Sequence, residues 1–199
     1  MLITEPSPRL PQIVAEVIEN GVNAVQWKEK RGVGMGFNRA YSDLSAVTKE
    51  TVTLIVNGDW QRAQRLHVRN MHLPEKSMPV GVVRHHLGEK TFIGKTAHSV
   101  QAAINAQSQG ADYLLAGNIF PSESEPKMEP LGLDVLREIC AAASIPVLAY
   151  GGITPENAAS CIEAGAVGIA VQSGIMRSSS PAEAADAYIN VLNDAWGDR

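Results

Sequence analysis

Two glycine-bearing turns near the end of the chain combine residue types that could bind an anion. Gly151 and Gly152 follow an apolar run and precede residues 154–155, a capping threonine and a proline suited to the first turn of a helix. Ser173 and Gly174 follow the next apolar run. Free backbone N–H groups at such turns bind phosphate, so this pattern predicts a phosphate site. The alternative is that the glycines only form the turns between strands and helices.

A second candidate lies at residues 25–30, Val-Gln-Trp-Lys-Glu-Lys. In an extended strand, the alternation of side chains puts Gln26, Lys28 and Lys30 on one face. Two cations on a face that points into a protein interior would be costly unless they meet an anion. We therefore expect this face to bind part of a substrate. The alternative is a strand end whose lysines extend into solvent.

These residues need a scaffold, and the chain between them alternates short β-branched runs with amphipathic segments. Strands are expected at 2–4, 24–28, 51–56, 68–73, 91–94, 113–116, 147–150 and 168–171. Helices are expected at 10–20, 37–49, 61–66, 100–109, 133–143, 156–164 and 181–196, with only a short connection at 81–88. Alternating units of this kind predict parallel strands, and the fold class is a (β/α)8 TIM barrel. A length of 199 residues favours a single domain spanning 1–199.

Composition limits the class of function. The net charge of −4, scattered basic residues and few aromatic residues disfavour nucleic-acid binding. No apolar run approaches membrane-spanning length, and the N-terminal residues do not resemble a signal peptide, so we expect a cytoplasmic protein with no membrane partner. Cys140 and Cys161 are expected to be buried apolar residues without chemistry. The longest irregular stretch, 117–130, is expected to be an active-site loop.

The chain resembles the thiamine phosphate synthase and TenI superfamily over nearly its whole length. The resemblance rests on ordered segments at 25–30, 54–57, 94–99, 110–113, 117–121, 151–153 and 173–175. Members catalyse one of two reactions. One couples a pyrimidine pyrophosphate to a thiazole phosphate, and the other aromatises the thiazole phosphate tautomer that precedes that coupling.

Three departures from the synthase pattern bear on the choice. Synthases use Mg²⁺, which prefers carboxylate oxygens. Gly58 stands where they carry one aspartate, residues 74–77 replace the segment that carries another, and Glu125 stands where they carry a lysine. Asp59 and Glu75 are nearby carboxylates that could substitute for the missing metal ligands. The departures favour the TenI branch, a thiazole tautomerase.

The resemblance implies that His98 is the catalytic residue, since an imidazole takes up and releases protons near neutral pH. The alternative is a histidine that only caps or packs. His72 is expected to be packed, and His67, His85 and His86 are expected at the surface. The remaining roles follow the resemblance. Substrate would be bound by Gln26, Lys28, Lys30, Asn57, Asn118, Ser122 and Ser124, and phosphate by Gly151, Gly152, Ser173 and Gly174.

The resulting hypothesis is a thiazole tautomerase, an isomerase, with a small-molecule thiazole phosphate as its partner. We expect no cofactor and no metal; magnesium belongs only to the synthase alternative. A homo-oligomer is expected because the superfamily commonly forms oligomers. Two alternatives stay open: a thiamine phosphate synthase, and a non-catalytic phosphate-ligand-binding regulator of TenI type.

Overall fold

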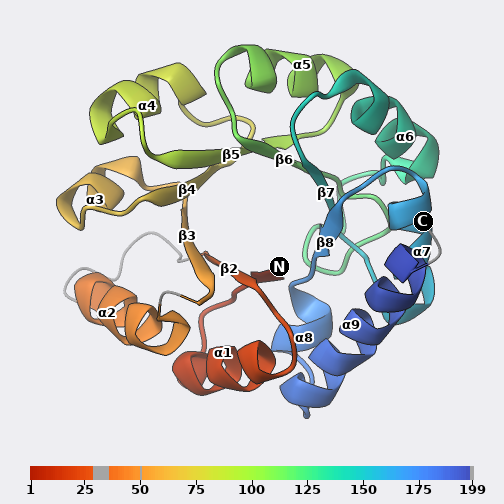
Figure 1. Ribbon diagram of the computed structural model, residues 1–199, viewed down its shortest axis with the longest axis horizontal. Coiled ribbons are helices and arrows are strands. Elements are labelled where there is room, and N and C mark those ends of the chain that lie inside the picture. Colours follow the sequence, from red (N-terminus) through yellow and green to blue (C-terminus); the bar gives the residue numbers. More distant parts are fainter. Residues whose placement is uncertain (29–35, 50, 198–199) are drawn as a thin grey trace.

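The computed structural model describes residues 1–28, 36–49 and 51–197. Its strands form one eight-stranded parallel sheet in the order β1 to β8. A bridge between Leu2 and Val171 joins the first strand to the last, so the sheet closes into a barrel. Helices surround the barrel, as Figure 1 shows. The predicted (β/α)8 fold is confirmed.

The strands are β1 (Leu2–Ile3), β2 (Ala24–Trp27), β3 (Thr53–Asn57), β4 (Asn70–Leu73), β5 (Phe92–Ala97), β6 (Tyr113–Ala116), β7 (Val147–Tyr150) and β8 (Gly168–Ala170). The helices are α1 (Leu10–Glu19), α2 (Gly36–Thr48), α3 (Trp60–Arg65), α4 (Val80–Leu87), α5 (Val100–Ser108), α6 (Gly132–Ala142), α7 (Pro155–Glu163), α8 (Ser173–Met176) and α9 (Pro181–Gly197). Most predicted elements lie within one to three residues of these bounds.

Two helices differ from the sequence prediction. Residues 81–88 were expected to be a short connection, but most of them form helix α4, whose apolar stripe is narrow because only Val80 and Val83 are buried. The helix ends at Gly88, whose φ of +98° suits glycine. His85 and His86 lie in its last turn and are exposed, as expected. The short helix α8 follows β8 directly and was not predicted.

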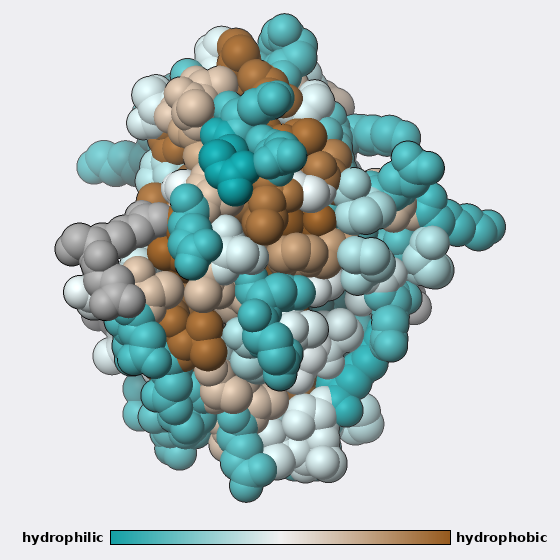
Figure 2. Space-filling model, turned by 90° about the vertical axis from the view of Figure 1, so that its right-hand side faces the viewer, coloured by the Kyte–Doolittle hydropathy of each residue, from teal (hydrophilic) through white to brown (hydrophobic). Residues whose placement is uncertain are grey.

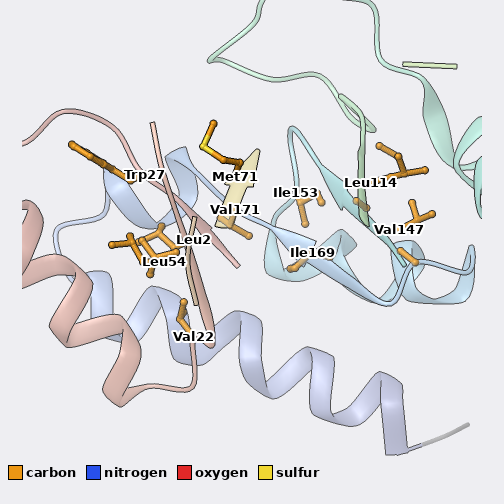
Figure 3. Close-up of a cluster of buried hydrophobic side chains, with 14 of the residues drawn as sticks. Leu2, Val22, Trp27, Leu54, Met71, Leu114, Val147, Ile153, Ile169 and Val171 are labelled. Atoms are coloured by element: carbon orange, nitrogen blue, oxygen red, sulfur yellow. The ribbon is translucent and has the colours of Figure 1, made fainter. Parts of the chain in front are cut away.

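Alternating side chains divide the core into two layers. The larger layer lies between strands and helices, where Trp27 on β2 packs against Phe37 of α2 with ring centroids 4.4 Å apart. Figure 3 shows part of this layer, including Leu2, Leu54 and Trp27. The smaller layer fills the barrel interior and contains Ile3, Ile55, Tyr113, Leu115 and Ala170. The residues that follow these inward positions toward the strand ends therefore point into the open end of the barrel.

The outer surface carries both hydrophilic and hydrophobic residues. Figure 2 shows the face on the right of Figure 1, where hydrophobic residues appear in separate areas among hydrophilic ones. Exposed apolar area of this kind is normal for a folded protein, because apolar atoms make up much of any protein surface. Within the described residues, no helix has both the length and the apolar character needed to cross a membrane.

Candidate active site

A cavity of about 180 Å³ opens at the carboxyl ends of the strands. Barrel enzymes place their chemistry at this end. Of the residues that the sequence predicted, the cavity is lined by Gln26, Lys28, Asn57, His98, Asn118, Ser122, Ser124, Gly151, Gly152, Ser173 and Gly174. Lys30, the remaining predicted binding residue, lies outside the described residues. The structure thus brings every described candidate to one cavity.

His98 follows β5 and is held from both sides. Its Nδ1 contacts the Glu75 carboxylate, which comes from the loop between β4 and α4. Its Nε2 lies 3.1 Å from the hydroxyl of Tyr150, the last residue of β7. Both partners also line the cavity. The imidazole is therefore oriented by two side chains from separate segments, the loop after β4 and the end of β7, rather than packed as an isolated ring.

The chemistry of the two partners fixes the tautomer of the neutral His98 ring. An ionised carboxylate can only accept a hydrogen bond, so Nδ1 keeps the ring proton and donates a hydrogen bond to Glu75. Burial, together with the negative charges of Glu125 and Glu75, raises the pKa of the Tyr150 hydroxyl, which therefore stays protonated. That hydroxyl donates to Nε2. Nε2 is then the basic nitrogen of the ring, as in histidines oriented by a carboxylate.

The turn after β7 depends on two glycines. Gly151 and Gly152 have φ of +88° and +67°, and a Cβ on Gly152 would lie 2.3 Å from the carbonyl oxygen of Pro121. This close approach brings the loop after β6 against the turn. Thr154 caps α7 as predicted, and its N–H donates to Asn157 Oδ1 at 2.9 Å. Among the described residues, no hydrogen bond from the N–H of Gly152 is found, so this donor is free for a ligand.

Two buried amide side chains also line the cavity with polar atoms that have no partner. Gln26 on β2 and Asn118 after β6 are each 2% exposed. Gln26 Oε1 and Asn118 Nδ2 make no hydrogen bond within the described part of the chain. Buried polar groups are normally satisfied, so these two atoms mark positions where a ligand can bond. Lys28, just beyond β2, adds a positive charge to the same cavity.

The carboxylates that the structure describes near the cavity are not grouped as magnesium ligands. Asp59 caps α3, where it accepts from the N–H of Arg62 at 3.0 Å and pairs with the Arg62 guanidinium at 3.2 Å. Glu75 is engaged by His98, which leaves Glu125 as the other carboxylate among the described residues that line the cavity. The described residues contain no group of three or more His, Cys, Asp or Glu placed to hold a metal ion. Mg²⁺ binds through oxygen ligands, and this donor set does not supply them as a cluster.

His72 has a structural place, as expected. It is buried inside the barrel, with Nδ1 3.0 Å from the Tyr113 hydroxyl and Nε2 2.8 Å from Thr96 Oγ1. Burial and the charges of Lys95 and Lys28 lower its pKa to about 3, so the ring is neutral. It packs beneath the cavity rather than lining it.

Two site residues were missed as partners of His98. Glu75 was considered only as a substitute metal ligand, and Tyr150 was not considered at all. The available signal for Tyr150 was its position, since a polar aromatic side chain at the end of a strand and directly before Gly151 and Gly152 points toward the functional end of a barrel. For Glu75 there was no comparable local signal.

Fold and site together define a (β/α)8 barrel with a polar cavity at the carboxyl ends of its strands. The chain belongs to the thiamine monophosphate synthase family, whose sequence pattern matches residues 1–175. It is similar to the thiamine-phosphate synthase of Haloarcula marismortui, with 36% identity over 181 residues that cover 88% of this chain and 86% of the relative. The thiamine-phosphate synthase of Clostridium tetani is 32% identical over 186 residues, which cover 93% of this chain and 89% of that protein.

A solved structure supports the same family and the same fold. The thiamine phosphate pyrophosphorylase from Pyrococcus furiosus superposes with a TM-score of 0.87 and 28% identity, covering 98% of this chain and 95% of that one. The superfamily expected from the sequence is confirmed, and with it an enzyme of thiamine biosynthesis. The relatives are named synthases rather than TenI tautomerases, so their names favour the coupling alternative over the tautomerase hypothesis.

Proposed function

We propose that this protein is an isomerase that aromatises a thiazole phosphate tautomer by proton transfer through His98. One observation carries the proposal: His98 lies in the cavity between the Glu75 carboxylate and the Tyr150 hydroxyl, with Nε2 as its basic nitrogen. A general base needs a fixed orientation and an unprotonated nitrogen at the reacting atoms. The contacts with Glu75 and Tyr150 fix the ring, and the lone pair of Nε2 would become available when the Tyr150 hydroxyl gives up its hydrogen bond to the bound substrate.

The proposed reaction moves one proton and changes no oxidation state. Nε2 of His98 removes the proton from the sp³ carbon of the thiazole ring. The released electron pair forms a double bond in the ring, and the exocyclic double bond shifts its electrons to its outer carbon. That carbon takes the proton back from Nε2, which yields the aromatic carboxythiazole phosphate. Glu75 stabilises the imidazolium that exists between the two transfers.

The remaining cavity residues would bind the charged ends of the substrate. The phosphate would lie at the turn of Gly151 and Gly152, next to Ser173 and Gly174, where it would accept from backbone N–H groups. Lys28 would face the substrate carboxylate as a point charge, and Gln26 would orient it. Asn57, Asn118, Ser122 and Ser124 would line the ring pocket.

A second candidate function is the coupling reaction of thiamine phosphate synthases. The names of the relatives favour it. The residues at the cavity favour it less, because coupling needs Mg²⁺ to neutralise the leaving pyrophosphate and the carboxylates that would bind the ion are displaced or engaged. Glu125 would also repel a polyanion, since it lines the cavity.

Assays of both reactions on the same preparation test the proposal. In the first, the protein is mixed with the thiazole phosphate tautomer, with and without a chelator, and aromatisation is followed against the rate in buffer alone. In the second, thiazole phosphate, the pyrimidine pyrophosphate and Mg²⁺ are supplied and thiamine phosphate is measured. We expect chelator-insensitive aromatisation and no coupling. Magnesium-dependent formation of thiamine phosphate would establish the second candidate, and binding without either reaction would establish a non-catalytic protein.

A further inference from the structure

Lys95 is a buried charged residue that the proposed reaction does not use. It lies on β5 and is 6% exposed. Its neighbour Thr96 lines the cavity, and Gly94 faces the Tyr113 ring inside the barrel. Because side chains alternate along a strand, Lys95 points to the outer side of the barrel wall, away from substrate.

The Lys95 ammonium is bound by neutral oxygens of one loop. Nζ donates to Ser77 Oγ at 3.0 Å and to the Met78 carbonyl at 3.1 Å, and the Ser77 carbonyl lies 3.5 Å away. Within the described residues, Lys95 forms no ion pair with a carboxylate. Burial lowers the pKa of this ammonium, while the negative charge of Glu75 opposes that shift. An ammonium buried without an ion pair is costly, so its interactions with this loop require an explanation.

The loop that Lys95 binds is the one that carries Glu75. The Ser77 N–H donates to the Pro74 carbonyl at 3.0 Å, and the Ser77 hydroxyl donates to the same oxygen. Residues 74–77 therefore form one turn with Glu75 inside it. Fixing Ser77 fixes the backbone of Glu75, and the Glu75 carboxylate contacts His98 Nδ1. Lys95 lies within β5 and His98 directly follows that strand, so both side chains contact the 74–77 turn from the same strand.

We propose that Lys95 is a positioning residue, which holds the turn at 74–77 so that Glu75 meets His98 and keeps the proton of the imidazole on Nδ1. The inference rests on the proposed function only in that His98 is the base. The position of the loop and the tautomer of the ring can be measured without any turnover.

The direct readout is the tautomer of His98, measured by ¹⁵N NMR of the ring nitrogens at pH 8. In the wild-type protein we expect the proton on Nδ1. Lys95→Met keeps the length and packing of the side chain but removes the ammonium, and Ser77→Ala removes its hydroxyl partner. Both should shift the tautomer ratio toward that of the exposed His67. Glu75→Ala sets the size of the full effect, and Lys90→Met, which removes an exposed ammonium, is the matched control.

Kinetics give a second readout. Lys95→Met should lower kcat roughly tenfold, the loss typical of removing a group that orients a functional histidine, and should change KM less than about twofold. When Lys95→Met is added to Glu75→Ala, kcat should fall no further, because Lys95 acts only through the contact of Glu75 with His98. A tautomer ratio that stays at the wild-type value in Lys95→Met and Ser77→Ala would overturn the proposal. If Lys95→Met does not fold, Ser77→Ala decides. If the wild-type protein does not aromatise the tautomer, the proposed function fails while the NMR result still decides the role of Lys95.

Discussion

Acidification should destabilise this protein through His72. The ring lies inside the barrel between Tyr113 and Thr96, and burial together with Lys95 and Lys28 lowers its pKa to about 3. A histidine in an unfolded chain titrates near pH 6.5. Between about pH 6.5 and about pH 3, the unfolded chain therefore binds a proton at His72 that the folded protein does not.

The sign and the size of the effect follow from this difference. Because the unfolded state binds more protons in this window, the free energy of unfolding rises with pH and falls on acidification. Each pH unit below about 6.5 removes about 1.4 kcal/mol. At pH 5 the contribution of His72 is a loss of about 2 kcal/mol relative to pH 8. That is a large part of the stability of a typical domain.

Urea unfolding of wild type and His72→Gln at pH 8, 6.5 and 5 measures this contribution. Gln does not titrate, so the variant should be less stable than wild type at pH 8 and should lose about 2 kcal/mol less on going to pH 5. His85→Gln, at an exposed position, is the control and should show the wild-type slope. Equal pH slopes for wild type and His72→Gln would refute the reasoning.

Two further predictions concern the cavity. Gly152→Ala should raise KM for the phosphorylated substrate at least about tenfold, because its Cβ would lie 2.3 Å from the Pro121 carbonyl oxygen and displace the turn. Gly88→Ala is the control, because Gly88 also has a positive φ but has open space around it; it should lower Tm without changing KM. An unchanged KM in folded Gly152→Ala would show that the phosphate binds elsewhere. Asn118→Ala should raise KM roughly fivefold with little change in Tm, since its Nδ2 has no partner within the described residues. A loss of Tm with KM unchanged would make Asn118 structural.

Local sequence patterns were sufficient to predict the barrel fold. Short β-branched runs separated by amphipathic segments predicted eight parallel strands, because a strand buried on both faces has a distinct composition. The prediction failed at α4, where only Val80 and Val83 are buried and the apolar period is too short to recognise. It also failed at α8, which has a single turn.

The site was predictable where chemistry and strand position coincide. His98, Lys28 and the turn of Gly151 and Gly152 follow strand ends, so the barrel itself brings them to one cavity. The contact of His98 with Glu75 was not predictable, because it depends on the path of the loop after β4. That path is set in part by Lys95, a lysine whose burial on the outer side of a strand no local pattern indicates.

The central claim is that His98 transfers the proton. The most direct measurement is kcat for aromatisation of the thiazole phosphate tautomer by His98→Asn, with substrate binding checked by calorimetry. Asn keeps a polar group but removes the titrating nitrogen, so kcat should fall by on the order of 10²-fold or more while the substrate Kd stays close to wild type. Aromatisation at the wild-type rate in a variant that binds substrate normally would contradict the account and remove His98 from the mechanism.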